Sequence, residues 1–87
     1  MIITMKTEAG ELILSELRRI RLSKGLDEIS ISPDSMLLGD ELGIDSLDLA
    51  MLIVFLEETT NVRPFECGFT MFKTVGELTK LFNGEPL

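Results

Sequence analysis

An unbroken apolar run from Leu49 to Leu56 constrains the fold of this 87-residue chain more than any other feature. Its eight residues are too few to cross a bilayer, so no membrane span is expected. We predict a helix from Ser46 to about Thr59, with Asp45 as its N-cap residue. At 100° per residue this helix is apolar on two opposite sides. One side carries Leu49, Leu52 and Leu56, flanked by Ile53 and Phe55.

The opposite side of the same helix carries Leu47, Met51 and Val54, which we call the outer strip. A surface helix normally has a single apolar stripe, so this one is either buried all round or presents a spare strip to a partner. A domain of this size buries only about 60–65% of the surface of its unfolded chain. We therefore expect the Leu49 side to face the core and the outer strip to be a docking surface.

Helical signals also occur on both sides of this segment. Four apolar residues at helical spacing predict a first helix from about Glu8 to Lys24, with Gly25 as a left-handed stop: Ala9, Ile13, Leu17 and Ile20. Four basic residues near its end suit the negative C-terminal dipole: Arg18, Arg19, Arg21 and Lys24. Thr74 and Glu77 form a capping-box pattern that opens a last helix, ended by Asn83-Gly84 and Pro86. Its apolar face is predicted to contain Val75, Leu78, Leu81 and Phe82.

The chain between the first two helices, from Gly25 to Asp45, has no strong period. We expect a long loop that lies across the helices, with one short helical turn near Met36. The stretch from Phe65 to Phe72 is expected to form one or two short turns. No segment alternates like a strand, so the prediction is all-α, a small three- to four-helix bundle in a single domain spanning 1–87.

Charge is unevenly distributed, with a net value of −7. No Lys or Arg lies between Lys24 and Arg63, a stretch that contains nine acidic residues. This sign disfavours nucleic acid and anionic membranes, which require basic surfaces. The acidic field either steers basic partners or keeps the protein soluble, and the charges alone favour neither role.

The residue inventory limits the chemistry that this chain can perform alone. It has no His and a single Cys, Cys67, so a zinc site, an internal disulfide and a Ser-His or Cys-His pair are not expected. We interpret Cys67 as a semi-buried or incidental thiol. Two-carboxylate hydrolysis is a distant alternative, because so small a core leaves little wall for a cleft. The N-terminus lacks a secretory pattern. We expect a cytoplasmic, monomeric protein that is not an enzyme.

The residues around Ser46 carry a family resemblance. Leu42-Gly43-Ile44-Asp45-Ser46-Leu47-Asp48 resembles the Leu-Gly-x-Asp-Ser-Leu signature of acyl carrier proteins, the phosphopantetheine-dependent carriers of fatty-acid, polyketide and related pathways. The ending Leu56-Glu57-Glu58 and the later Phe72-x-Thr74-Val75-x-x-Leu78 also resemble that family. The likeness is strongest over 11–82.

The resemblance implies that Ser46 receives 4′-phosphopantetheine from coenzyme A through a separate phosphopantetheinyl transferase. The thiol of this arm would then hold acyl groups as thioesters. Asp45, Asp48, Glu57 and Glu58 match family acids that dock basic surfaces of acyl-loading, synthase and acyl-transfer enzymes, although each alone is also explained as a solvated charge. Met51 stands where fatty-acid carriers commonly have an acid. This departure favours a specialised carrier. An unmodified carrier-like interaction module is the alternative.

Overall fold

The computed structural model describes residues 5–66 and 68–85, with the side chains of the first helix described from Ala9 onward. Within these ranges the fold is all-helical, as predicted, and contains three helices and no strand. They are α1 (Met5–Ser23), α2 (Ser46–Thr60) and α3 (Val75–Asn83). The first helix begins earlier than the predicted Glu8, and a fourth helix is absent from the described residues. None of these helices is both long enough and apolar enough to cross a bilayer.

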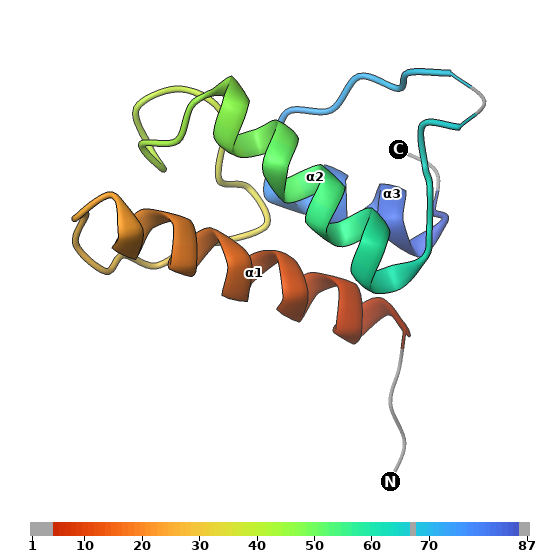
Figure 1. Ribbon diagram of the computed structural model, residues 1–87, viewed down its shortest axis with the longest axis horizontal. Helices are drawn as coiled ribbons and strands as arrows, with labels where there is room; N and C mark the ends of the chain where they lie inside the picture. Colours follow the sequence, from red (N-terminus) through yellow and green to blue (C-terminus); the bar gives the residue numbers. More distant parts are fainter. Residues whose placement is uncertain (1–4, 67, 86–87) are drawn as a thin grey trace, which may run out of the picture.

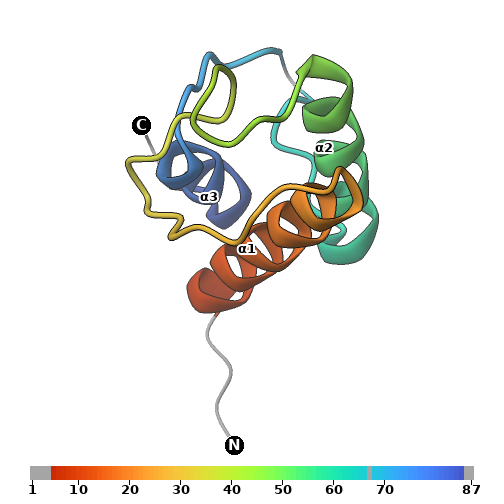
Figure 2. The same ribbon diagram turned by 90° about the vertical axis from the view of Figure 1, so that its left-hand side faces the viewer.

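Helix α1 is the element on which the other two pack (Figure 1). Viewed nearly along α1, α2 lies on one side and α3 on the other (Figure 2). The predicted core faces of α1 and α3 are confirmed, except that Leu81 is only half-buried. The core also takes in residues from the connection between α1 and α2. Its buried apolar members are Ala9, Ile13, Leu17, Ile20, Leu37, Leu42, Ile44, Leu52, Leu56, Val75, Leu78 and Phe82.

Residues 24–45 connect α1 to α2 and cover the start of α3. The carbonyls of Ser35 and Pro33 accept hydrogen bonds from the first N–H groups of α3, at 3.0 Å and 2.8 Å. These N–H groups have no partner inside the helix, so the connection satisfies them. Met36 forms an isolated antiparallel bridge with Thr74, and residues 24–45 contain no helix, so the prediction of a short helical turn near Met36 is wrong. The backbone of residues 36–37 instead pairs with residues 73–74, which directly precede α3.

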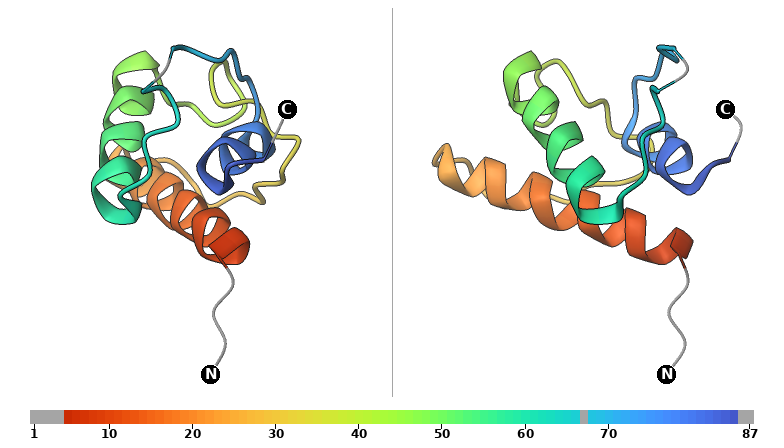
Figure 3. Two further views of the ribbon diagram at one scale, coloured as in Figure 1. Left: turned by 90° about the vertical axis from the view of Figure 1, so that its right-hand side faces the viewer. Right: turned by 45° about the vertical axis from the view of Figure 1, so that its right-hand side comes forward.

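Residues 61–74 leave the end of α2 and return to the start of α3 (Figure 3). Two consecutive turns close through the N–H of Glu66 to the carbonyl of Arg63 and the N–H of Gly68 to the carbonyl of Phe65. Phe65 stacks on Phe69 and Phe72, with ring centroids 5.3 Å and 5.7 Å away. Aromatic stacking therefore organises this connection where a regular element is missing. Cys67 and Pro86, about which the sequence made predictions, lie outside the described residues.

The predicted capping box at α3 is confirmed. The Thr74 hydroxyl accepts a hydrogen bond from the N–H of Glu77, and the Glu77 carboxylate accepts from the N–H groups of Lys73 (2.6 Å) and Thr74 (3.2 Å). The bond from Lys73, followed by that from Thr74, lowers the pKa of Glu77. Gly84 ends the helix in the left-handed conformation, as expected.

Glu77 should contribute to the acid sensitivity of the fold. Its folded-state pKa lies below its unfolded value of about 4.3, so its carboxylate stabilises the fold above that pH and this stabilisation is lost as the pH falls through the folded-state pKa. Glu77→Gln removes the titration but keeps an oxygen acceptor. Its melting temperature should therefore drop less than that of the wild type between about pH 7 and pH 2.

Circular dichroism melts across this pH range measure the effect. Glu11→Gln, on the exposed surface of α1 and outside both capping boxes, is the matched control. An equally flattened pH profile in the control would contradict the role assigned to Glu77.

Candidate functional site

Ser46 is exposed and is the first residue of α2. Asp45 caps this helix, as predicted, because its carboxylate accepts the N–H of Asp48 at 2.9 Å. The Asp48 carboxylate accepts the N–H of Asp45 at 3.1 Å and completes a capping box. The first N–H groups of a helix have no intrahelical acceptor and lie at the positive end of its dipole. The hydroxyl of Ser46 is therefore carried by a capped helix start at the protein surface.

Lys24 ties this helix start to the end of α1. Its ammonium lies 2.6 Å from the Asp48 carboxylate. This hydrogen bond, followed by the one from the N–H of Asp45, lowers the pKa of Asp48. Sequence reasoning assigned Asp48 to partner docking. In the structure its carboxylate binds Lys24 and the helix cap, whereas the neighbouring Asp45 is exposed.

Arg21 is a residue of the site that sequence reasoning missed. It is only 8% exposed, and its guanidinium donates to the carbonyls of Leu42 and, at 2.7 Å, Asp27. The sequence analysis assigned Arg21 only a favourable interaction with the C-terminal end of the helix dipole, and it did not predict these two hydrogen bonds. The available signal was spacing: Arg21 follows Leu17 by four residues and Ile13 by eight, which places it on the buried face of α1. A cation on such a row indicates buried polar partners.

Gly43 lies between two buried residues, Leu42 and Ile44, and has a φ of +70°. A Cβ at this position would lie 2.9 Å from Cδ1 of Leu26 and 3.6 Å from Nη1 of Arg21. The backbone conformation therefore favours glycine, and a larger residue would also make the end of the Leu26 side chain shift. The chain reaches Asp45 and Ser46 through this left-handed residue.

The two apolar sides of α2 have different environments. Leu52 and Leu56 are fully buried, and Leu49 is half-buried. The outer strip is exposed, by 67% at Leu47, 60% at Met51 and 52% at Val54. Beside it lies a groove of about 360 Å³ between α1 and α2. The groove is lined by Glu16, Arg19, Ala50, Met51, Val54, Phe55 and Glu58.

The acids at the far end of α2 are also in different environments. Glu58 is exposed and lines the groove. Glu57 is half-buried, and its carboxylate lies 3.9 Å from Arg63. On the opposite wall, Arg19 pairs with Glu16. The carboxylate of Glu58 therefore faces solvent beside the outer strip, while that of Glu57 is partly neutralised.

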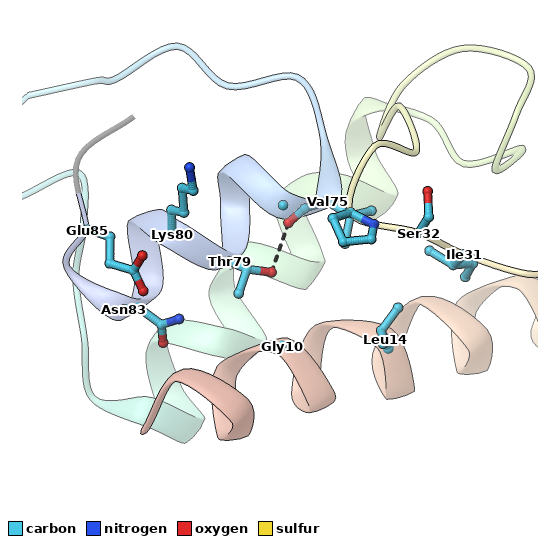
Figure 4. Close-up of a pocket in the computed structure, with 11 residues that line it drawn as sticks. Gly10, Leu14, Ile31, Ser32, Val75, Thr79, Lys80, Asn83 and Glu85 are labelled. Carbon is cyan, nitrogen blue, oxygen red and sulfur yellow. Dashed lines mark hydrogen bonds between the residues drawn. The ribbon is translucent and has the colours of Figure 1, made fainter. Parts of the chain in front are cut away.

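A second cavity, of about 420 Å³, lies between α1, α3 and residues 31–33 (Figure 4). Leu14, Ile31 and Val75 contribute apolar surface to it, and the Thr79 hydroxyl is occupied by a hydrogen bond to the Val75 carbonyl. None of its lining residues belongs to α2. This cavity is therefore separate from the surface that carries Ser46 and the outer strip.

No protein-family model matches the sequence, and no solved structure is a significant match for the fold. Among residues 5–66 and 68–85, no group of three or more His, Cys, Asp or Glu side chains is arranged to hold a metal ion. The exposed serine at a capped helix start and the adjoining outer strip are the features on which a functional proposal rests.

Replacing two left-handed glycines, Gly25 and Gly43, with alanine tests the backbone conformation before Ser46. Gly25 also has a positive φ, of +76°, but a Cβ there meets nothing within 4 Å. We expect Gly25→Ala to cost about 1–2 kcal/mol from backbone strain alone. Gly43→Ala should cost about 0.5–1.5 kcal/mol more, because the end of the Leu26 side chain has to move to a less favourable rotamer. Urea denaturation of both variants measures the difference, and equal destabilisation would show that Leu26 moves aside freely.

Proposed function

We propose that this protein is an acyl carrier whose Ser46 receives a 4′-phosphopantetheine arm from coenzyme A. The observation that carries the proposal is the exposure of Ser46 as the first residue of the capped helix α2. The surrounding Leu42-to-Asp48 sequence resembles the acyl carrier signature. A hydroxyl buried in the core would have been incompatible with this role.

The local chemistry suits a phosphodiester. In the transfer, Oγ of Ser46 forms a new bond to the phosphorus that bears the pantetheine group, and the bond from that phosphorus to the second phosphate of coenzyme A breaks. Adenosine 3′,5′-bisphosphate leaves, and the hydroxyl proton passes to a base of the transferase, since this chain contains no His. The first-turn N–H groups and the helix dipole stabilise the resulting anion. When bound, the arm supplies a thiol that carries acyl groups as thioesters.

Partner enzymes are proposed to dock on the outer side of α2. Leu47, Met51 and Val54 offer apolar contact, and Asp45 and Glu58 place exposed acids near the two ends of the strip. Asp48 and Glu57 add to the acidic field although each is already close to a base. Such a surface fits a transferase, and acyl-loading, synthase or acyl-transfer enzymes, with mixed basic and apolar docking sites. We propose that the carrier acts as a cytoplasmic monomer and leaves the catalysis to these enzymes.

Modification of Ser46 is the direct test of the proposal. Incubation with coenzyme A and a broad-specificity phosphopantetheinyl transferase should add the mass of one phosphopantetheine group, detected by intact-protein mass spectrometry. Ser46→Ala should abolish the addition. Ser30→Ala, which changes an exposed serine of the α1–α2 connection, should leave it unchanged.

An unchanged wild-type mass, under conditions that modify a control carrier, would overturn the proposal. It would instead favour an unmodified interaction module, the second candidate, which the exposed outer strip also supports.

Met51 points to a specialised carrier within this proposal. It is 60% exposed and lies between Leu47 and Val54, so partners meet an apolar centre where fatty-acid carriers commonly present an acid. The protein loaded with its arm should support general fatty-acid elongation about tenfold more slowly than a housekeeping carrier, a difference of about 1.4 kcal/mol. Met51→Glu should recover part of this rate, measured in a reconstituted elongation assay. Thr59→Glu, which adds the same charge to an exposed site near the end of α2, is the control. Elongation by the wild type as fast as by a housekeeping carrier would refute the specialisation.

A further inference from the structure

Arg21 occupies a position where an apolar residue would be the simpler choice. It continues the buried row of α1, yet it carries a charge that is costly to remove from water unless that charge is hydrogen-bonded. Its described hydrogen bonds go to main-chain oxygens, those of Asp27 and Leu42. The side chain therefore has a role that an aliphatic residue of similar length cannot perform. It supplies two donors to a loop that contains no helix of its own.

These two carbonyls come from opposite ends of the connection between α1 and α2. Asp27 lies shortly after α1, and Leu42 lies four residues before Ser46. A single planar guanidinium binds both, which closes the connection onto α1. Lys24, the residue directly after α1, binds Asp48 in the first turn of α2. Two basic side chains, one in α1 and one directly after it, therefore hold the chain on both sides of Ser46.

The chain between Leu42 and Ser46 transmits this restraint. Gly43 has a left-handed backbone, and a Cβ built on it would lie 3.6 Å from Nη1 of Arg21. Ile44 is buried in the core, and Asp45 is the N-cap. The path from the guanidinium to the serine is therefore short and includes a buried residue and a helix cap, which restrain the position from which Ser46 leaves the surface.

We infer that Arg21 is a positioning residue for the transfer of phosphopantetheine to Ser46. This inference rests on the proposed function. Arg21 acts through the Leu42 carbonyl and takes no part in the chemistry. Fixing a nucleophile in advance raises the rate of the chemical step, and a displacement of about 1 Å can cost as much as about 100-fold. The docking surface is on the outer side of α2, away from this contact, so loss of Arg21 should affect kcat more than KM.

The experiment compares Arg21→Lys, Arg21→Met and Arg18→Met as substrates of one transferase, with coenzyme A in excess. Arg21→Met keeps an apolar stem but removes both hydrogen bonds, and its kcat should fall about tenfold or more while KM changes by less than about twofold. Arg21→Lys keeps the charge but lacks the planar fork, so it should rescue part of the loss. Arg18 is exposed on the same helix, and Arg18→Met should match the wild type.

A second measurement separates positioning from global stability. Kinetics are measured well below the melting temperature of every variant, and amide hydrogen exchange is followed in the unmodified proteins. Arg21→Lys should exchange faster at residues 43–47 with little change in α3. If Arg21→Met does not fold, the comparison of Arg21→Lys with the wild type still tests the inference, because Arg21→Lys keeps the charge but loses the fork that binds both carbonyls.

The possible outcomes separate the two claims. Equal kcat values for the wild type and the Arg21 variants would overturn the role of Arg21 and leave the proposed function intact. A fall in kcat that follows the melting temperature, with exchange raised throughout the chain, would reduce Arg21 to a structural residue and overturn the inference. A wild-type protein that the transferase does not modify would overturn the proposed function and this inference together.

Discussion

The hydrogen bonds from the buried guanidinium of Arg21 to two backbone carbonyls tie both ends of the connection between α1 and α2 to α1. Residues 24–45 contain no helix, so their conformation depends on contacts with the helices rather than on their own repeating bonds. Arg21 binds this segment near both of its ends, at Asp27 and Leu42. Leu37, between these two points, and Leu42 are buried in the core. The same segment then caps α3 through the carbonyls of Pro33 and Ser35. One side chain of α1 therefore helps to place the starts of both α2 and α3.

The two sides of helix α2 differ in their exposure to water. Its inner side supplies Leu52 and Leu56 to the core, and its outer side leaves the outer strip in water. Ser46 is the first residue of this helix, and Asp45 caps it. The ion pair between Asp48 and Lys24 links the helix start to the residue that follows α1. In the proposed carrier, a rigid inner side gives the attachment point a fixed position, and the outer strip presents it to successive enzymes. The two requirements are met by one helix of 15 residues.

Local signals in the sequence predicted local structure well. Capping and termination depend on residues within one turn of each other, so Asp45, the Thr74 and Glu77 pair, and Gly84 could be assigned from spacing. The core faces of the helices followed from periodicity.

The contacts of residues 24–45 could not be predicted, because this segment has no period. Ile29 and Leu38 are as apolar as Leu37 and Leu42, yet the first two are exposed and the others buried. Likewise, the pairing of Lys24 with Asp48 and of Arg21 with Leu42 joins residues far apart in the chain, and it exists only after the helices have packed. Ser46, in contrast, was identified from the family resemblance, and its role stays a prediction.

The exposure of the outer strip also has a consequence for how this sequence can change during evolution. A substitution at Leu47, Met51 or Val54 removes no atoms from the core, and exposed positions usually change the free energy of unfolding by less than about 0.5 kcal/mol. In the proposed carrier, mutations there can accumulate and change the binding of partner enzymes without first being offset elsewhere. A duplicated copy of the proposed carrier could thus acquire different partner enzymes through a few changes on one face, while the scaffold beneath stays as it is.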